Sequence, residues 1–351
     1  MDFPRPLSIH APFPYPTNTT KTTPIVTMAS IPTPAPSPPP STKGTTTTTT
    51  TTTAQDTLQP WIETPLIYSA QMSRNAGCNI YLKLENVQPS GSFKSRTATI
   101  VVPLSTSPFM VQKLKDAGAQ VVQKGQSWIE ADTFLREELL AKDTPGVENV
   151  YVPPFDHPAI WRGASTLIDE VVRQMPEGQK MDAVVCNVGG GGLVNGVCEG
   201  VHKHGLEDGV KVVALETEGA DSLFQSTLKG ELVTLEGITS LATSLGARTV
   251  SGRTWEWYQQ MKGGFVSGVV TDKEAAEACV RFLDEGRVMV ELSCGATLAG
   301  VYKDQGRWLR EQVGKGVSDE EWKGKNVVVV VCGGSNVSWE ILEGYKKTFG
   351  F

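Results

Sequence analysis

Residues 182–193 have the sequence DAVVCNVGGGGL, in which a mainly apolar run ends in four consecutive glycines. The run 182–188 is apolar on both faces, as expected of a strand in a parallel sheet that helices cover on both sides. A helical pattern begins near Leu193, directly after the glycines. A strand, a glycine-rich turn and a helix in this order predict an α/β fold with ligand sites at the carboxyl ends of its strands.

The glycine turn itself predicts an anion site. Glycine lets the backbone approach an anion closely, and the N-terminus of the following helix offers unpaired N–H groups and the positive end of a dipole. A phosphate group is the expected occupant, and a β-branched residue at Gly190 or Gly191 is expected to fill the space that the phosphate needs. Two alternatives stay open, a turn without a ligand and a dinucleotide site with Glu216 as the ribose-binding acid. The dinucleotide fingerprint G-x-G-x-x-G lacks its third glycine, at Val194 or Asn195.

Similar runs extend the pattern along the chain. Strands are predicted at residues 79–84, 99–102, 210–215 and 326–332. Between them, apolar residues recur at helical spacing, in one set Ala164, Leu167, Ile168, Val171, Val172 and Met175, and in a shorter set Trp128, Ala131, Leu135 and Leu139. Alternating strands and helices predict a doubly wound parallel sheet.

The composition argues against several classes of function. The net charge of −6 comes from 32 basic and 38 acidic residues without a long run of one sign, so no nucleic-acid-binding face is predicted. The six cysteines form no CxxC pair and the four histidines show no metal-binding spacing, which predicts reduced thiols in a reducing compartment. The longest apolar run, residues 327–331, is far too short to span a bilayer, so no membrane segment is expected.

Residues 1–56 differ in composition from the rest of the chain. They contain 12 of the 22 prolines and nine consecutive threonines from Thr45 to Thr53, with few charges. Such a segment cannot bury enough apolar surface to offset its conformational entropy, so it is predicted to be a disordered tail. A mitochondrial targeting peptide is the alternative, but such peptides are rich in arginine and this tail has one, and Met28 is an alternative start.

Two further turns of small residues lie near strand ends, SGSFK at residues 90–94 and CGGSN at residues 332–336. A lysine in such a turn, here Lys94, can be desolvated until its pKa falls and it acts as a nucleophile and a base. A lysine considered by itself is usually a surface cation. The motifs around Lys94 therefore decide its interpretation.

Several separated motifs make the chain resemble the β-family of pyridoxal phosphate enzymes, and the serine dehydratase branch in particular. The motifs are TPL at 64–66, YLKLEN at 81–86, QPSGSFK at 88–94, PPFDHP at 153–158, LETEGA at 215–220 and VCGGSN at 331–336. They occur in the family's order within roughly residues 60 to 345. The resemblance implies a two-domain α/β fold of the tryptophan synthase β type, with residues 57–351 as the enzyme region and a smaller domain at about 95–160.

By this resemblance, Lys94 holds pyridoxal 5′-phosphate as a Schiff base, Phe93 packs on the pyridine ring and Cys332 stands at the pyridine nitrogen. The phosphate is held by the backbone of the glycine turn, formed by Gly189, Gly190, Gly191, Gly192 and Leu193. Glu216 and Ala220 match a stretch that helps to bind a monovalent cation such as potassium, although Glu216 could equally be an acid at a helix entry. The resemblance also implies a homodimer in the cytoplasm.

The implied reaction is β-elimination, which converts L-serine to pyruvate and ammonia, or L-threonine to 2-oxobutanoate and ammonia. The neutral thiol of Cys332 offers no negative charge to stabilise a protonated pyridine nitrogen. A weaker electron sink favours loss of the β-substituent together with the α-proton, which is elimination rather than transamination. Lys94 is the expected base at Cα, and the cofactor phosphate is the expected acid at the leaving hydroxyl.

One part of the family pattern is absent. After the lysine, the family continues with a helix, a strand ending in a Ser-Gly-Gly-Asn type loop, and a second helix, whereas here residues 95–98 lead directly into the strand at 99–102. The absent elements would need roughly 40 residues. Their loop grips the substrate carboxylate in the family. The alternatives are therefore a mis-spliced product, a catalytically impaired protein that still binds the cofactor, and a β-replacement enzyme of the cysteine synthase type.

The absence also affects strand pairing. Parallel neighbours need a crossover of a dozen or more residues. The strand at 99–102 is therefore expected to pair antiparallel or at a new edge, and otherwise the segment after Lys94 is displaced and leaves an open sheet edge.

Overall fold

The computed structural model describes residues 62–88, 99–104, 106, 108–116, 118–126, 128–142 and 151–351. The predicted tail, residues 1–56, lies outside this set. Phe93 and Lys94 also lie outside the described residues.

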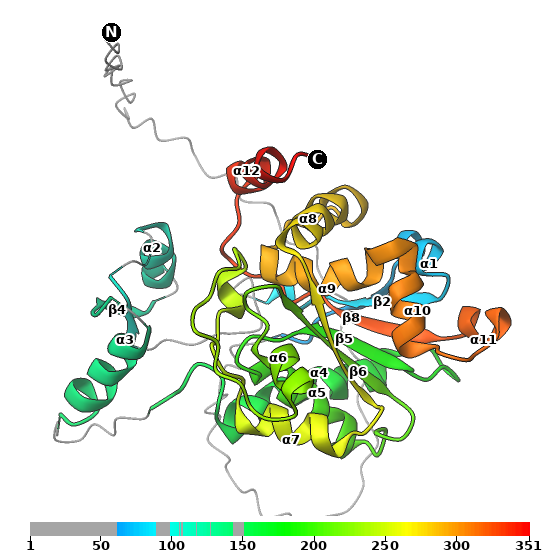
Figure 1. The fold of residues 1–351 in the computed structure, drawn as a ribbon, viewed down its shortest axis with the longest axis horizontal. Coiled ribbons are helices and arrows are strands. Elements are labelled where there is room, and N and C mark those ends of the chain that lie inside the picture. The colour runs from blue at the N-terminus through cyan, green and yellow to red at the C-terminus, as the bar shows by residue number, and fades with distance from the viewer. Residues whose placement is uncertain are drawn as a thin grey trace, which may run out of the picture. The chain divides into compact units, whose positions relative to one another are not determined.

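Six strands of the described residues form one mostly parallel sheet (Figure 1). In spatial order they are β1 (Leu66–Tyr68), β2 (Asn79–Lys83), β8 (Asn326–Val330), β5 (Ala183–Asn187), β6 (Lys211–Thr217) and β7 (Phe265–Val270). Only the β1–β2 pair is antiparallel within this sheet. The predicted α/β fold with a parallel sheet is confirmed, and the last strand in sequence, β8, lies between β2 and β5.

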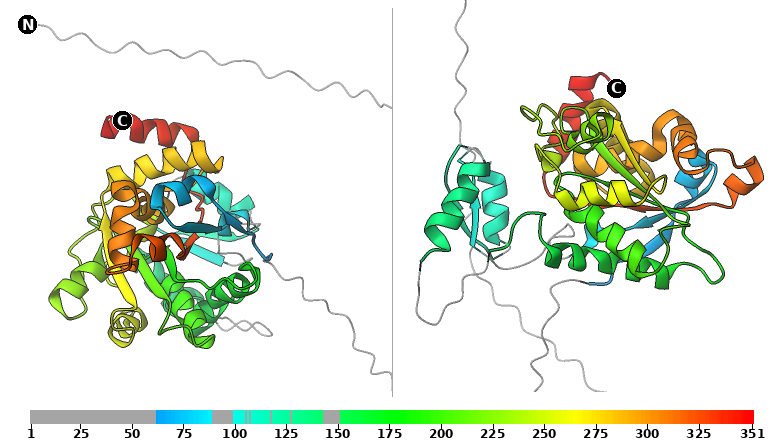
Figure 2. Two further views of the ribbon diagram at one scale, coloured as in Figure 1. Left: turned by 90° about the vertical axis from the view of Figure 1, so that its right-hand side faces the viewer. Right: turned by 60° about the horizontal axis from the view of Figure 1, so that its bottom comes forward.

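Helices cover both faces of this sheet (Figure 2). One face carries α4 (Pro158–Gln174), α5 (Gly192–Lys203) and α7 (Gly252–Gln260). The other carries α1 (Ala70–Ala76), α8 (Asp272–Gly286), α9 (Leu292–Tyr302) and α10 (Arg307–Val313). Shorter or peripheral elements complete this part, namely η1 (Glu85–Val87), α6 (Ser222–Lys229), η3 (Thr243–Leu245), η4 (Lys303–Gly306), α11 (Asp319–Lys323) and α12 (Trp339–Phe349).

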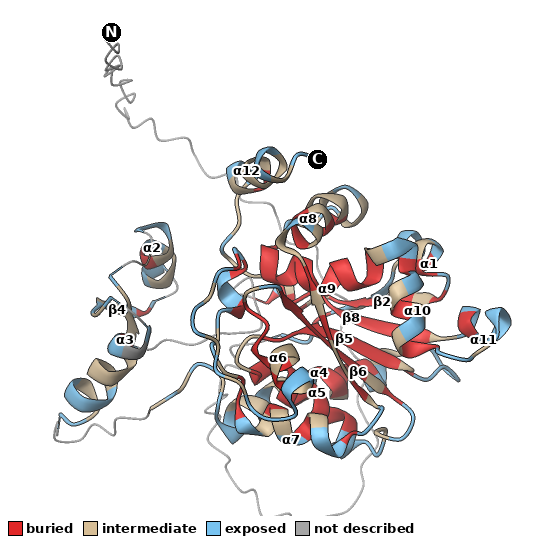
Figure 3. Cartoon of the chain, viewed as in Figure 1, coloured by how far each residue is buried: buried red, intermediate tan, exposed pale blue. Residues whose placement is uncertain are grey.

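Burial explains why the central strands read as continuous apolar runs. Every residue of β5 and β8 is buried, and every residue of α9 is buried as well (Figure 3). A helix that is apolar all round belongs inside a protein, and α9 lies between the sheet and α8. In α4 the predicted face holds at Leu167, Ile168 and Val171, but Val172 is 40% exposed, so its assignment to the buried face was wrong. It adjoins Val171 in sequence and therefore points about 100° away on the helix.

The strand at 99–102 lies in a separate two-stranded sheet. Here β3 (Thr99–Val102) pairs in parallel with β4 (Gln120–Gln123), and α2 (Pro108–Asp116) is the crossover helix between them. The strand was expected to pair antiparallel or at a new edge, and antiparallel pairing is wrong because a helical crossover follows the strand. Thr99 is exposed and the other three residues are half-buried, so β3 is not covered on both faces as predicted. The helix α3 (Trp128–Phe134) continues into a π-helical segment η2 (Leu135–Leu139).

Among the helices of the described residues, none combines the length and the apolar character that crossing a bilayer requires.

Candidate active site

The glycine turn lies between β5 and α5, as the sequence predicts. Gly191 is the N-cap of α5 and has φ = +107°, a conformation that only glycine adopts without strain. The carbonyl of Gly191 accepts the first helical hydrogen bond, from the N–H of Asn195 at 2.9 Å. The N–H groups of Gly190, Gly191 and Gly192 have no acceptor within the part of the chain that the structure describes. Free donors at the start of a 12-residue helix fit a phosphate group.

The other side of the turn is closely packed. A Cβ atom built on Gly190 would overlap the ring of Phe155, and one built on Gly191 would overlap the hydroxyl of Thr254. A β-branched side chain at Gly190 or Gly191 would thus clash with Phe155 or Thr254. It would not fill the space of the phosphate, as the sequence analysis expected. The Cα atoms of the turn therefore rest against the protein, while its N–H groups have no acceptor among the described residues.

Cys332 lies directly after β8, beside the end of β5. Its Sγ accepts a hydrogen bond of 3.1 Å from Nδ2 of Asn187, which also donates to the carbonyl of Ser293 at 2.7 Å. A hydrogen bond with Cys294 and burial together raise the pKa of the Cys332 thiol well above its ordinary value. The thiol is therefore neutral at physiological pH, as the sequence analysis assumed. All six cysteines are free and buried.

Asn187 and Cys294 were missed by the sequence analysis. The signal for Asn187 was present, because an amide at the end of an otherwise apolar strand needs a buried partner. Nothing local marks Cys294, which lies in α9 and reaches Cys332 only through the packing of α9 on the sheet.

Glu216 lies near the end of β6 and is fully buried. Its two carboxylate oxygens accept hydrogen bonds from the N–H groups of Leu223 at 2.9 Å and Phe224 at 2.7 Å, in the first turn of α6. Burial raises the pKa of Glu216 to about 8. Glu216 is thus an acid at a helix entry, one of the two interpretations of the sequence. Ala220 is also buried, and its N–H donates to the carbonyl of Thr217.

The described residues contain no group of three or more histidine, cysteine, aspartate or glutamate side chains that could hold a metal ion.

Comparison with known protein families identifies the family to which this chain belongs. The family model described as "Pyridoxal-phosphate dependent enzyme" matches residues 57–99 and 97–333. The chain belongs to this family. Among its relatives, "Serine dehydratase-like" of Homo sapiens is 40% identical over 82% of this chain and 95% of the relative. "L-serine dehydratase/L-threonine deaminase" of Bos taurus is 37% identical over 82% of this chain and 96% of the relative.

A solved structure shows the same relationship. A fungal L-serine ammonia-lyase from Rhizomucor miehei is 30% identical, with a TM-score of 0.72, and the match covers 83% of this chain and 99% of that protein. The resemblance to the serine dehydratase branch of the pyridoxal phosphate family is therefore confirmed.

Within this family framework, the structure brings two of the predicted sets together. The glycine turn follows β5 and Cys332 follows β8, and these strands are hydrogen-bonded neighbours. On the other side of β5 lies β6, which contains Glu216 and is followed by Ala220. Lys94 and Phe93 lie outside the described residues, so their roles remain predictions.

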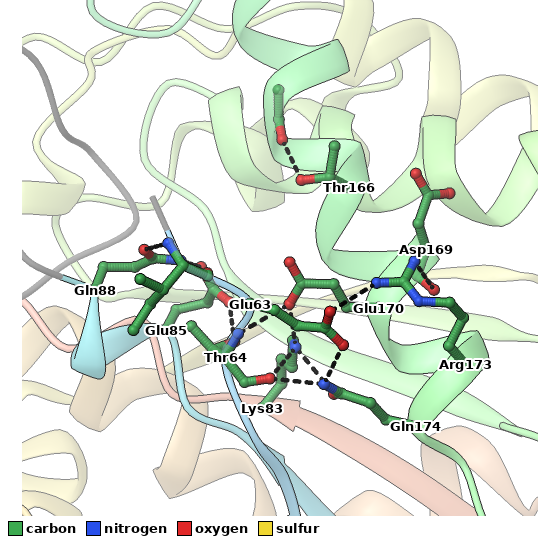
Figure 4. A network of polar contacts seen from close by, with 12 residues as sticks. Glu63, Thr64, Lys83, Glu85, Gln88, Thr166, Asp169, Glu170, Arg173 and Gln174 are labelled. Carbon is green, nitrogen blue, oxygen red and sulfur yellow. Dashed lines mark hydrogen bonds and ion pairs between the residues drawn. The ribbon is translucent and has the colours of Figure 1, made fainter. Parts of the chain in front are cut away.

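A buried polar network lies beside β2, whose motif leads toward Lys94 (Figure 4). The Nζ atom of Lys83 lies 2.5 Å from Oε2 of Glu170 and 2.7 Å from the carbonyl of Thr64. The hydroxyl of Thr64 donates to Glu85 at 2.6 Å, and Gln88 exchanges two hydrogen bonds with the backbone of Ile62. The network ties β2 and η1 to α4. The sequence signal was Lys83 itself, because a charge within an apolar strand requires a partner.

Proposed function

We propose that the site performs pyridoxal-phosphate-dependent elimination on L-serine, giving pyruvate and ammonia, with L-threonine as a second substrate giving 2-oxobutanoate and ammonia. The carrying observation is the pair of features at adjacent strand ends. The free N–H groups at the start of α5 suit a phosphate, and the buried neutral thiol of Cys332 suits a pyridine nitrogen. The names of the relatives from cattle and R. miehei support the substrate.

The proposed roles follow from these positions. The backbone of Gly189 to Leu193 binds the phosphate, and Cys332, oriented by Asn187, contacts the ring nitrogen. When bound, the cofactor withdraws electron density from Cα of the amino acid. Lys94 takes the proton from Cα and Phe93 packs on the ring. The Cys332 thiol places no negative charge at the ring nitrogen, which favours elimination over transamination.

A monovalent cation belongs to the same proposal. Glu216 lies in β6 and Ala220 lies in the loop that follows this strand. Among the described residues, the hydrogen-bond partners of the buried Glu216 carboxylate are backbone N–H groups. A cation such as potassium would stabilise its ionised form. We also propose a homodimer in the cytoplasm, in keeping with six free, buried thiols.

We further propose that residues 57–351 form the enzyme region of a two-domain fold, preceded by a tail, and that the smaller domain lacks a segment after Lys94. The family model matches in two pieces whose boundary, residues 97–99, falls where the segment is expected. In addition, β3 has β4 as its one strand partner among the described residues, and no described strand pairs with its other edge. The substrate carboxylate contact is expected in the absent part.

If the segment after Lys94 is absent, two other functions are candidates. A mis-spliced or impaired protein would bind the cofactor without releasing pyruvate. A β-replacement enzyme of the cysteine synthase type would consume L-serine only with an added thiol, which the neutral Cys332 disfavours.

The anchor is tested with Lys94→Ala. Wild-type protein mixed with pyridoxal phosphate should show a visible absorbance band that resists dialysis, and Lys94→Ala should lack it. Lys323→Ala, which removes an exposed lysine on α11, should keep the band. A persistent band in Lys94→Ala would mean that another residue anchors the cofactor. Pyruvate, 2-oxobutanoate and thiol-adduct assays on the same samples then separate the three functions.

A further inference from the structure

Three buried polar side chains form a hydrogen-bonded cluster beside the glycine turn, on the side where the Cα of Gly191 packs. Asn195 comes from α5, and Ser251 and Thr254 come from the start of α7, and their exposures are 0%, 3% and 0%. Nδ2 of Asn195 donates to Oγ of Ser251 at 2.9 Å, and the Thr254 hydroxyl donates to Oδ1 of Asn195 at 2.9 Å. The two hydroxyls lie 3.0 Å apart, so Ser251 donates to Thr254 and the ring of hydrogen bonds closes. We call these residues the polar triad.

A backbone hydrogen bond from Ser251 fixes the orientation of the peptide between Gly190 and Gly191. Ser251, whose side chain belongs to the triad, donates its backbone N–H to the carbonyl of Gly190 at 2.9 Å. In a trans peptide the C=O and the following N–H point in opposite directions. The N–H of Gly191 must therefore point away from Ser251, toward the side proposed for the phosphate.

The next peptide is fixed in the same way from α5. The N–H of Asn195 donates to the carbonyl of Gly191, so the N–H of Gly192 points away from the helix. Asn195 thus acts twice, once through its backbone and once through its side chain in the triad.

Thr254 adds a steric constraint. Its hydroxyl occupies the place that a Cβ of Gly191 would take, directly against the Cα of the turn. Gly191 can therefore approach α7 closely and keep its left-handed conformation, and any movement of the turn toward α7 is blocked.

Resting on the function proposed above, we propose that Asn195, Ser251 and Thr254 are positioning residues for the cofactor phosphate. They direct the N–H groups of Gly191 and Gly192 and so make the protein bind pyridoxal phosphate in preference to unphosphorylated pyridoxal. A buried polar network whose hydrogen bonds are all made rigidifies its surroundings in one arrangement. The polar triad therefore suits a turn that needs one defined backbone orientation.

The test measures the dissociation constants of pyridoxal phosphate and of pyridoxal for full-length protein by absorbance titration. Thr254→Val keeps the shape of the side chain and removes its hydroxyl, so it should raise the dissociation constant of pyridoxal phosphate by about tenfold, as expected for one lost hydrogen bond to a buried group. Its affinity for pyridoxal should stay the same. Thr254→Ser, which restores the hydroxyl, should recover most of the preference.

Two further variants keep the test decisive. Ser251→Ala removes one hydroxyl but keeps the hydrogen bond from the backbone N–H of residue 251 to the carbonyl of Gly190. It should reduce the preference for pyridoxal phosphate over pyridoxal less than Thr254→Val does. This variant still tests the proposal if Thr254→Val fails to fold. Ser226→Ala removes an equally buried hydroxyl on α6 that accepts from the N–H of Val233, and it should leave the preference unchanged.

The outcomes separate the two proposals. Wild-type protein that binds both compounds equally would refute the phosphate site itself. Wild-type preference that survives in Thr254→Val, or equal weakening of both compounds in that variant, would refute the positioning role of the polar triad.

Discussion

At the scale of single residues, Glu216 is unusual because its carboxyl group is fully buried at the end of β6 and is not part of an ion pair with a described residue. Burial raises its pKa from the ordinary 4.5 to about 8. In the folded protein the group stays protonated over a range in which the unfolded chain has lost the proton. The stability that this adds is complete below pH 4.5 and is lost as the pH rises through about 8.

We therefore expect the free energy of unfolding to fall between pH 4.5 and about 8 in potassium-free buffer, and Glu216→Gln to show a flatter dependence. Urea unfolding at several pH values measures this. Potassium should stabilise wild-type protein more at pH 8 than at pH 5 if the cation binds ionised Glu216. The exposed neighbour variant Glu218→Gln is the control and should follow the wild-type curve. Parallel curves for wild type and Glu216→Gln would contradict the assignment.

At the scale of elements, β2 and α4 are joined by the ion pair of Lys83 and Glu170. The Lys83 side chain is fully buried and that of Glu170 is 10% exposed. Removing one member of a buried pair leaves an uncompensated charge, whereas replacing both members with apolar residues is often tolerated. The pair is therefore best judged by single and double variants together.

Glu170→Gln should destabilise the protein by roughly 3–5 kcal/mol in urea unfolding, because Lys83 keeps its charge without its partner. The double variant Lys83→Met with Glu170→Leu should be less destabilised than Glu170→Gln alone. Arg173→Ala on the same helix removes an exposed pair with Glu63 and should cost about 0–1 kcal/mol. An effect of Glu170→Gln as small as that of Arg173→Ala would show that the pair contributes little.

At the same scale, part of the site could be predicted from the sequence and part could not. The glycine turn and Cys332 could be found because each directly follows an apolar strand, and strand ends meet at one edge of a parallel sheet. The polar triad could not be found in this way. Ser251 and Thr254 lie more than 50 residues after Asn195, and only the packing of α7 on α5 brings them together.

At the scale of the whole molecule, the segment that we propose to be absent after Lys94 would be the main departure from the family. A two-stranded sheet such as β3–β4 is marginally stable alone. The edge of β3 that no described strand pairs with favours aggregation, as do apolar side chains such as Leu104 and Phe109, which are 53% and 57% exposed.

Inserting the helix, strand and helix of a dehydratase relative after Lys94 should therefore raise solubility and thermal stability, and it should also increase the turnover of L-serine. Light scattering, thermal unfolding and pyruvate release measure the three effects. A flexible Gly/Ser insert of equal length is the control and should restore none of them. Equal pyruvate production from the original and repaired chains would show that the segment is dispensable.

The sequence by itself determined the fold class, the family, the glycine turn and Cys332, because each depends on residues that are close together in the chain. It also indicated Glu216 as a notable residue, but not its partners. Tertiary structure alone decided that β8 lies between β2 and β5, that Asn187 and Cys294 contact Cys332, and that the three residues of the polar triad meet beside the glycine turn. These contacts join residues distant in sequence, and hydrophobic periodicity determines which residues are buried but not which of them become neighbours.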